Sequence, residues 1–267
     1  MLSQERIEAA LTSEFIGRQL VYLPVTSSTN TVAKELAREG APDGTVVVAD
    51  EQSAGRGRLD RRWLAPPATS ILCSILFRPE LPLDRALYLM MVCSLAAADA
   101  VGQVSALRPA LKWPNDLIVE DEQARWRKLA GLLTETGVRG DRLEYVIVGI
   151  GINVNIGAGD LPALAPDATS ILAETGQPVD RVALLAVLLA EIDQRYQALR
   201  AGESPYGEWA GRLATLGRQV RAVTPTGVIT GMAEYVDHGG VLFLRTGGGV
   251  LHRLQAGDVT LIHAEAT

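Results

Sequence analysis

The chain is poor in the residue types on which several common catalytic sites depend. Its 267 residues include only two cysteines and three histidines. Cys73 and Cys93 lie in apolar stretches, where we expect buried free thiols, and two cysteines are too few for a cysteine-ligated metal site. The histidines, His238, His252 and His263, all fall near the end of the chain. The sequence therefore disfavours Ser-His-Asp and Cys-His hydrolases and histidine-rich metal enzymes.

Excess positive charge and long hydrophobic runs are also absent from the sequence. The formal net charge is -6, whereas nucleic-acid-binding domains usually have a basic face. The longest apolar run, residues 86–101, is shorter than a membrane span and contains Asp99. The first residues lack the cationic region and apolar core of a signal peptide. Because hydrophobic residues make up 48% of the chain, we expect a globular, cytoplasmic protein with neither nucleic acid nor membrane as a partner.

Hydrophobic periodicity predicts helices and strands that interleave irregularly along the chain. After Gly217 the pattern changes to short strands, with glycine turns expected at 227, 231, 239–240 and 247–249. We therefore predict an α+β domain on a mixed or antiparallel sheet over 1–217 and a small β-barrel domain over 218–267. Helices are expected at 4–11, 27–39, 84–104, 168–174, 180–200 and 205–214, and strands at 19–25, 45–50, 70–78, 111–113, 117–119, 128–136 and 145–152.

Two short motifs carry the strongest chemical signal. Residues 52–58 are Gln-Ser-Ala-Gly-Arg-Gly-Arg, and residues 112–116 are Lys-Trp-Pro-Asn-Asp. Glycine lets the backbone approach a ligand closely, and the planar forks of arginine match carboxylate or phosphate groups. The pattern indicates a small anionic ligand that carries phosphate. Because the sequence has neither a Rossmann glycine fingerprint nor a Walker A loop, a nucleotide would be bound in another way.

Five motifs, taken in order, resemble the signature of the biotin protein ligase family. The resemblance covers residues 22–175, and the final β domain is similar to the family's C-terminal SH3-like module. It implies a class II synthetase-like fold. Because little chain precedes Ser27, it also implies a short form without the N-terminal DNA-binding domain of some relatives. The motifs are Ser28-Thr29-Asn30, Gln52 with Gly55-Arg56-Gly57-Arg58, Lys112-Trp113-Pro114-Asn115-Asp116, Lys128-Leu129-Ala130-Gly131 and Gly149-Ile150-Gly151-Ile152-Asn153-Val154-Asn155.

The resemblance implies a two-step ligation. The carboxylate of biotin attacks the α-phosphate of ATP, which gives biotinyl-5'-AMP and pyrophosphate, and a lysine of a carrier protein then takes the biotinyl group and releases AMP. ATP and Mg²⁺ are the implied co-substrates and biotin is the substrate, with no tightly bound prosthetic group. The implied partner is the biotin carboxyl carrier protein or domain of a biotin-dependent carboxylase, and a homodimer is left open. A lipoate or octanoate ligase of similar fold is the nearest alternative, followed by a biotin-sensing repressor and an inactive binding protein.

The same resemblance assigns residues to the biotin site. Ser28, Thr29 and Asn30 would hydrogen-bond the ureido ring, with Gln52 as a further contact. Helix capping is the alternative for the first three, and a solvated loop position is the alternative for Gln52. The glycine-arginine loop would wrap the biotin carboxylate and the phosphate, unless it is only a solvated charge run. The remaining residues assigned to biotin are Gly55, Arg56, Gly57, Arg58, Lys128, Gly131 and Leu133.

Catalytic and nucleotide-binding roles follow from the resemblance as well. Asp116 would hold Mg²⁺, or deprotonate the incoming lysine, or cap a turn. At Asp60 the chain departs from the family, which usually has glycine there, so the closing geometry of the loop is open. Arg56, Arg58, Lys112 and Lys128 would neutralise charge as the adenylate forms. Nucleotide contacts are expected from Arg58, Trp63, Asn115, Lys128, Asn153, Thr169 and Ser170, with core packing as the alternative for Trp63 and a helix start as the alternative for 168–172.

Overall fold

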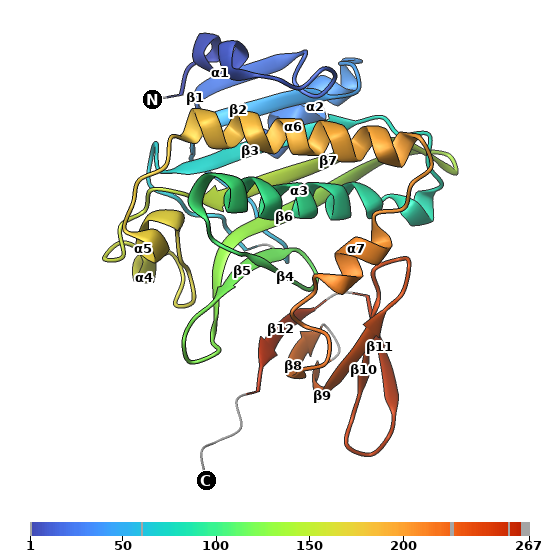
Figure 1. Ribbon diagram of the computed structural model, residues 1–267. Helices are drawn as coiled ribbons and strands as arrows, with labels where there is room; N and C mark the ends of the chain where they lie inside the picture. Colours follow the sequence, from blue (N-terminus) through green and yellow to red (C-terminus); the bar gives the residue numbers. More distant parts are fainter. Residues whose placement is uncertain (1, 60, 225–226, 256, 263–267) are drawn as a thin grey trace.

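A seven-stranded mixed sheet forms the centre of the protein (Figure 1). Its strands are β1 (Leu20–Thr26), β2 (Thr45–Gln52), β3 (Ser70–Phe77), β4 (Ala110–Lys112), β5 (Asp116–Glu120), β6 (Trp126–Arg139) and β7 (Arg142–Asn153). They are arranged in the order β1-β2-β3-β7-β6-β5-β4. β1 and β2 are parallel, and the other neighbours are antiparallel. The computed structural model describes residues 2–59, 61–224, 227–255 and 257–262. The predicted α+β fold on a mixed sheet is confirmed.

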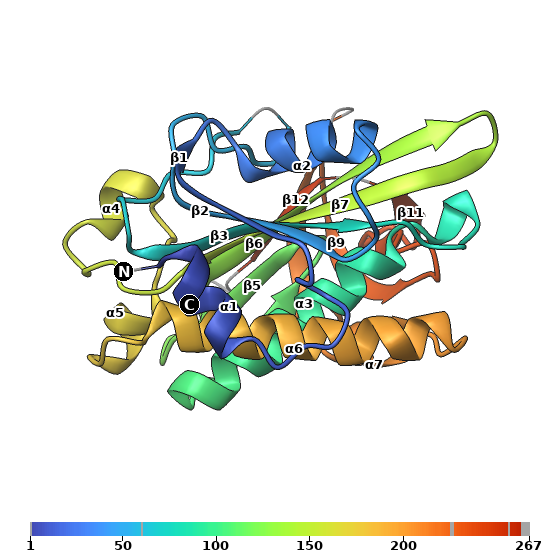
Figure 2. The same cartoon turned by 90° about the horizontal axis from the view of Figure 1, so that it is seen from above.

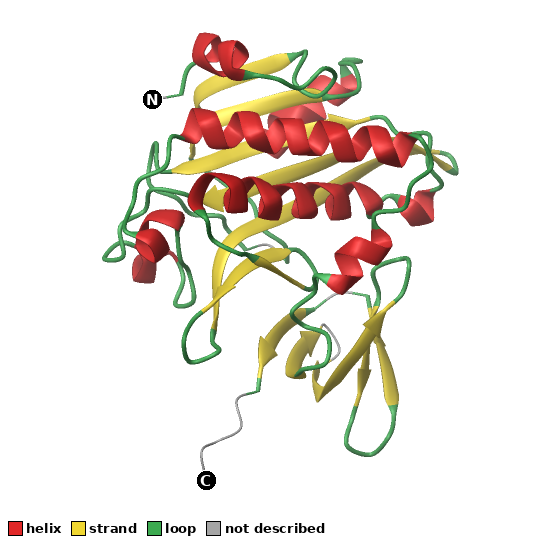
Figure 3. Ribbon diagram, in the orientation of Figure 1, coloured by secondary structure: helices red, strands yellow, loops and turns green. Residues whose placement is uncertain are grey.

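Helices cover both faces of this sheet (Figures 2 and 3). Helices α3 (Tyr88–Ser105) and α6 (Arg181–Arg200) lie side by side across one face, and α1 (Gln4–Ala10) packs beside α6. Helix α2 (Thr29–Arg38) lies on the opposite face, against β2, β3 and β7. The N-terminal end of α2 therefore brings the predicted motif at 28–30 to the face that α3 and α6 leave uncovered.

The sheet serves both helical layers because successive side chains of a strand point to opposite faces. In β2, Val46 and Val48 belong to the core formed with α3 and α6, whereas Val47 packs with Ala33 and Ala37 of α2. Buried, β-branched side chains of this kind suit a strand that is covered on both faces. The continuous apolar run at 45–49 is thus explained by two cores.

The most apolar helical stretch belongs to the larger core. Leu83–Ser105, which includes the 3₁₀ turn η1 (Leu83–Arg85), is long and apolar enough to cross a membrane, but 72% of its apolar window is buried inside the fold. Cys93 on α3 and Cys73 on β3 are buried free thiols, as predicted. Burial raises the pKa of the Cys73 thiol to about 12 and that of Cys93 well above its usual range. Both thiols are therefore held in the unreactive protonated form.

The C-terminal part forms a second, five-stranded antiparallel sheet, in the order β11-β10-β9-β8-β12. No pairing between the edge strands β11 and β12 closes this sheet in the part of the chain that the structure describes. The turn predicted at Gly231 is wrong, because this glycine lies inside β9. A side chain there would meet the backbone of Arg245, with a Cβ only 2.3 Å from its carbonyl oxygen. The strands are β8 (Gln219–Thr224), β9 (Gly227–Val236), β10 (Leu242–Arg245), β11 (Leu251–Leu254) and β12 (Asp258–Leu261).

Other differences from the predicted elements are confined to their ends and to short helices. Helices α5 (Ile171–Thr175) and α7 (Tyr206–Gly211) are shorter than expected, and α4 (Leu161–Leu164) is an additional single turn. Helix α5 ends at Gly176, whose positive φ of 69° stops the helix. Local capping of this kind sets helix ends more finely than hydrophobic periodicity.

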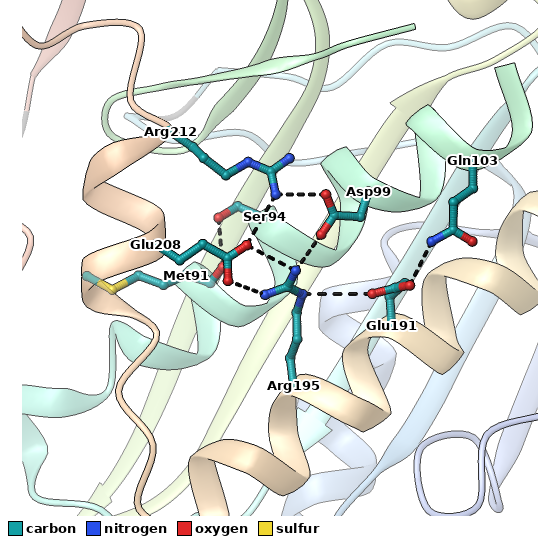
Figure 4. A network of polar contacts seen from close by, with 8 residues as sticks. All are labelled: Met91, Ser94, Asp99, Gln103, Glu191, Arg195, Glu208 and Arg212. Carbon is teal, nitrogen blue, oxygen red and sulfur yellow. Dashed lines mark hydrogen bonds and ion pairs between the residues drawn. The ribbon is translucent and has the colours of Figure 1, made fainter. Parts of the chain in front are cut away.

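Ion pairs fasten α7 to the two long helices (Figure 4). Arg195 of α6 pairs with Asp99 of α3 and with Glu208 of α7, where Nη1 and Oε2 are 2.7 Å apart. Arg212, which follows α7, lies 2.7 Å from Asp99 and 3.3 Å from Glu208. Because α7 leads into the C-terminal sheet, these contacts fix the connection between the two sheets.

Replacing Glu208 by glutamine is expected to lower the free energy of unfolding by about 0.5–1 kcal/mol at neutral pH, since the carboxylate is almost half exposed. The hydrogen bond from Arg195 is the main reason that the pKa of Glu208 lies below its usual range, and burial opposes it. The stabilisation is therefore present above the unfolded pKa and is lost as the pH falls through the folded pKa. Denaturant unfolding at neutral and acidic pH checks this. A difference that persists unchanged in acid would contradict it.

Candidate active site

A cavity of about 280 Å³ lies on the α2 face of the central sheet. Its wall is built from the start of α2, the loop after β2, the β4–β5 corner, β6, β7, the segment around residues 164–168, and the start of β12. Most of the residues predicted from the motifs line this cavity. They are Ser28, Thr29, Asn30, Gln52, Arg56, Gly57, Arg58, Trp63, Lys112, Asn115, Asp116, Lys128, Gly131, Leu133 and Asn153.

Neutral polar groups surround one end of the cavity. Gln52 Oε1 accepts hydrogen bonds from the Thr29 amide at 2.7 Å and from the Thr29 hydroxyl at 3.1 Å, so Gln52 caps the first turn of α2. Ser28 occupies the N-cap position, but its side chain makes no capping hydrogen bond within the described residues. Ser28 also lines the cavity, so its contact with a ligand stays a prediction.

Asn30 is wedged between three strands. Its Nδ2 donates to Leu133 O at 3.3 Å, and its Oδ1 lies 2.6 Å from the hydroxyl of Ser74 on β3. Gly149 on β7 makes room for it, because a Cβ there would lie 2.1 Å from Asn30 Oδ1. Ser74 was not predicted from the sequence, although a polar residue inside the apolar run of β3 is a usable signal. The contact with Asn30 therefore explains why position 149, one of the two glycines in the buried strand β7, is glycine.

The partly buried carboxylate of Glu135 on β6 is a second group that the motifs did not reveal. It accepts hydrogen bonds from Asn30, Lys34 and Arg56 at 2.8–3.1 Å. Burial raises the pKa of Glu135, but the hydrogen bonds from Lys34 and Asn30 and the charges of Arg56 and Lys34 outweigh it and hold the pKa below its usual range. Glu135 is therefore an ionised carboxylate beside the polar end of the cavity.

The glycine-arginine loop folds back on itself as a small irregular hairpin. Trp63 N donates to Gly55 O at 3.0 Å, and Gly57 N donates to Arg61 O at 2.7 Å. Gly55 does not line the cavity, but a Cβ there would lie 2.5 Å from the carbonyl oxygen of Trp63, so the closure of the hairpin requires glycine. Leu59 at the tip has a positive φ of 53°. Asp60, where the loop departs from the family pattern, lies outside the described residues.

The C-terminal sheet closes the cavity beside this loop. Gly257, Asp258 and Thr260 line the cavity. Arg58 donates to Asn115 Oδ1 at 3.1 Å and to Gly257 O at 3.4 Å, and Arg61 pairs with Asp258 at 2.9 Å. Burial lowers the pKa of the Arg58 guanidinium from its ordinary value. No residue of this wall could be predicted from the sequence, because the wall arises from packing between the two sheets.

Trp63 lies inside the cavity against the sheet. A Cβ on Gly151 would be 2.5 Å from its Cε2, and one on Gly131 would be 3.1 Å from its Cζ3, so both glycines make room for the indole. Its Nε1 is buried and has no hydrogen-bond partner within the described residues. The ring therefore serves as an apolar floor of the cavity, and its predicted nucleotide contact stays a prediction.

Lys128 and Asp116 form the charged centre of the cavity. Lys128 Nζ lies 2.6 Å from Asp116 Oδ1 and 5.8 Å from the centre of the Trp63 ring. Asp116 and Lys128 belong to neighbouring strands, and Asn115 anchors the corner through its Nδ2, which donates to Leu132 O at 2.6 Å. The pairing fixes the direction of the lysine ammonium toward the cavity.

Lys112 is a buried cation without a counter-ion. Only 7% of the residue is exposed, and no acidic group of the described residues lies within ion-pair distance. Its Nζ lies 5.9 Å from the centre of the Trp126 ring, a cation–π contact that offsets part of the desolvation. Six basic residues line the cavity in the described part of the chain, against the three aspartates Asp116, Asp167 and Asp258. This excess of positive charge favours the binding of an anionic ligand.

The segment predicted to cover the nucleotide is placed differently from the expectation. Thr169 and Ser170 are fully buried and do not line the cavity. The Thr169 hydroxyl bonds to Glu174, and Ser170 caps α5 by accepting from Ala173 N at 3.0 Å. Ser170 therefore lies at the start of a helix, which was the alternative prediction for the segment 168–172. Leu164, Ala165, Asp167 and Ala168 reach the cavity from this segment instead.

Asn153 is the polar link between β7 and this segment. Its Nδ2 donates to Thr169 O at 2.9 Å, while its Oδ1 is buried and lacks a partner within the described residues. Asn153 therefore positions the 164–170 segment and leaves one acceptor beside the cavity.

The described side chains do not form a metal centre of their own. No group of three or more His, Cys, Asp or Glu side chains that could hold a metal ion occurs within residues 2–59, 61–224, 227–255 and 257–262. Of the three aspartates that line the cavity within the described residues, Asp116 is the one that pairs with Lys128. This donor set suits an ion that is held mainly by substrate phosphates and water, as Mg²⁺ commonly is.

Two family models match the chain. Residues 22–153 match the biotin/lipoate A/B protein ligase family, and residues 215–261 match the biotin protein ligase C-terminal domain. The bifunctional ligase/repressor BirA of Bacillus subtilis is 35% identical over 97% of this chain and 79% of its own length. The biotin--[acetyl-CoA-carboxylase] ligase of Mycobacterium tuberculosis is 34% identical over 94% of both chains. The biotin protein ligase of Aquifex aeolicus in complex with biotin and ATP has a TM-score of 0.72 at 28% identity, covering 92% of this chain and 100% of that one. The chain therefore belongs to the biotin protein ligase family.

Proposed function

We propose that the protein activates biotin with ATP to biotinyl-5'-AMP and transfers the biotinyl group to a lysine of a biotin carboxyl carrier protein. One observation supports this proposal above others. A neutral pocket of hydrogen-bonding groups continues directly into a cluster of six basic side chains, which outnumber the three aspartates that line the cavity with them in the described part of the chain. A ligand with a polar, uncharged head and a carboxylate that becomes a phosphoric anhydride matches both halves.

The neutral end would hold the ureido ring of biotin. A urea has N–H donors and a carbonyl acceptor, and the hydroxyls of Ser28 and Thr29 can serve both. Gln52 fixes the Thr29 hydroxyl directly, and Asn30 fixes it through the hydroxyl of Ser74. Gly131 and Leu133 on β6 supply the apolar wall that small ligands usually require.

The cationic centre would neutralise the two anions that must meet in the first step. Arg56, Arg58, Lys112 and Lys128 would hold the biotin carboxylate and the α-phosphate close together, and phosphoryl transfer is catalysed largely by such positioning and charge stabilisation. Lys128, held by Asp116, would contact the developing negative charge. The loop with Trp63 would then exclude water from the reactive acyl-adenylate.

Mg²⁺ belongs to this proposal as a companion of ATP. When bound, the ion supplies charge neutralisation at the phosphates. Asp116 is the residue that would hold it, together with the phosphates themselves. In the second step, attack by the carrier lysine on the carbonyl carbon forms an amide bond and expels AMP. We assign Asp116 to orienting Lys128 in both steps.

Arg58→Gly is expected to shorten the lifetime of bound biotinyl-AMP by about ten- to a hundredfold, because a charge-assisted contact over the cavity is lost. Release can be followed by rapid dilution and trapping of the free adenylate. Arg61→Gly is the matched control. It adds the same flexibility to the loop and also removes a basic residue from the cavity wall, but Arg61 is mostly exposed and already paired with Asp258, so its effect should be smaller. Equal lifetimes in Arg58→Gly and the wild type would contradict the proposed role.

The wider setting is part of the proposal. We assign the catalytic domain to 1–217 and a C-terminal domain to 218–267. We propose that the C-terminal domain is an SH3-like barrel. The partner is a carrier protein or domain of a biotin-dependent carboxylase in the cytoplasm, without nucleic acid or membrane. A homodimer is compatible with this scheme. Thr169 and Ser170 would act on the nucleotide only indirectly, by positioning the 164–168 segment.

ATP–pyrophosphate exchange tests the proposed function. Purified protein is incubated with ATP, Mg²⁺ and labelled pyrophosphate, in the presence of biotin, of lipoate, or of no acid. Exchange with biotin alone is expected, followed by labelling of an added carrier domain on a single lysine. Exchange with lipoate alone would show that the protein is a lipoate ligase. No exchange with either acid would refute a ligase role.

A further inference from the structure

We propose that Glu135 is a positioning residue for biotin binding, which orients Asn30 and Arg56 without touching the ligand itself. The inference rests on the proposed function and deepens it. Glu135 does not line the cavity, but it lies directly behind two residues that do, Asn30 and Arg56. It stands two residues after Leu133 on β6, so its side chain points to the same face of the sheet.

The carboxylate joins three separate elements. Only 14% of its side chain is exposed. It accepts from Asn30 Nδ2 at 3.1 Å and from Lys34 Nζ at 2.8 Å, both on α2, and from Arg56 Nη1 at 3.0 and 3.1 Å, on the loop. A carboxylate that was only a structural partner of α2 would not need the arginine of a cavity loop as well.

Glu135, together with the carbonyl oxygen of Leu133, sets the direction of a chain of hydrogen bonds. An ionised carboxylate only accepts, so Asn30 must present its Nδ2 to Glu135 and its Oδ1 to Ser74. The hydroxyl of Ser74, 2.6 Å from Asn30 Oδ1, then donates its single proton to Asn30. Its oxygen, 2.7 Å from Thr29 Oγ1, can only accept from Thr29. The Thr29 proton is thereby directed to Ser74 or to Gln52, which leaves a lone pair of Thr29 for an N–H group of the ligand.

Glu135 also binds only one nitrogen of the Arg56 guanidinium and leaves the others for a ligand. Nη1 contacts both carboxylate oxygens, while the remaining nitrogens make no hydrogen bond within the described residues. Because Lys34 shares the same carboxylate, one negative charge faces two positive charges. The cluster keeps an excess positive charge, so Arg56 is held in place and still attracts an anion.

Titration calorimetry of the full-length chain with biotin, in the absence of ATP, tests the inference. Glu135→Gln is expected to weaken biotin binding by about ten- to a hundredfold, since hydrogen bonds to a charged group are lost at two ligand contacts. The KM for ATP in the exchange reaction should remain that of the wild type. Glu144→Gln is the matched control. It removes the same charge from the neighbouring strand β7, where Glu144 pairs only with the exposed Arg139, so biotin binding should not change.

The possible results separate this inference from the proposed function. If the wild type does not bind biotin, the proposed function fails. If the wild type binds biotin and Glu135→Gln binds it equally well, only the role of Glu135 is overturned. A parallel rise in the KM values for biotin and ATP would also overturn it, because a general distortion would then explain the loss. Should Glu135→Gln fail to fold, Glu135→Asp keeps the charge but shortens the reach. Wild-type biotin affinity in that variant would again refute the inference.

Discussion

Lys128→Ala is expected to reduce the rate of biotin-dependent ATP–pyrophosphate exchange by about 10²–10³-fold, the usual loss when one stabilising donor is removed from a reacting oxyanion. In the folded protein the ammonium of Lys128 lies 2.6 Å from Asp116 and points into the cavity. No other lysine is placed to replace it, because Lys112 approaches from the β4–β5 corner and lies against Trp126. The loss should therefore appear in the chemical step.

Lys128→Arg provides the control for this result. It keeps the positive charge but replaces a compact ammonium by a planar fork that needs more space beside Trp63. Partial exchange activity is expected from this variant, together with normal thermal unfolding of both. Near-normal exchange by Lys128→Ala would remove Lys128 from the reaction and leave Lys112 as the main cation.

Gly149→Ala is expected to weaken biotin binding by more than a hundredfold, although it adds only one methyl group. The new Cβ would lie 2.1 Å from Asn30 Oδ1 and 2.9 Å from its Cγ. Asn30 cannot move aside without losing its contacts with Leu133, Glu135 and Ser74. Overpacking at such a site costs about 1–3 kcal/mol in stability, so the melting temperature should fall as well.

Gly159→Ala is the matched control for this substitution. Gly159 has no atom within 4 Å of the position that a Cβ would take, and its φ is outside the positive range that strains other residues. Both variants make the same chemical change, and calorimetry with biotin distinguishes them. Biotin affinity equal to that of the wild type in Gly149→Ala would show that Asn30 is not part of the biotin site.

The sequence predicted the fold well where the signal was periodic and local. The buried strands β2, β3 and β7 lie within three residues of their expected ends, because each is a continuous apolar run that two helical layers require. Helix ends were less accurate. Helix α5 begins after its N-cap Ser170 and ends before Gly176. The prediction of a helix over 168–174 followed the apolar pattern and did not use these two capping residues.

The site was predictable where a motif carried it and unpredictable where tertiary contacts created it. Gln52 was expected to touch the ligand, but its capping of α2 depends on β2 ending beside Thr29, twenty-three positions away in sequence. Glu135 lies at alternate positions with Gly131 and Leu133, so period-two reasoning along β6 could have revealed it. Asp258 had no such signal, because it reaches Arg61 only through the packing of one sheet against another.

The wall that β12 adds to the cavity has a consequence for the order in which the protein is made. Gly257, Asp258 and Thr260 follow the whole central sheet in the chain, so they are synthesised after Ser28, Gln52 and the strands that carry the rest of the cavity. A chain still held on the ribosome can fold its central sheet, since domains form as they emerge. It cannot yet close the side of the cavity next to Arg58. A growing chain thus has no complete chamber for a reactive adenylate until β12 has been synthesised and has packed beside the loop.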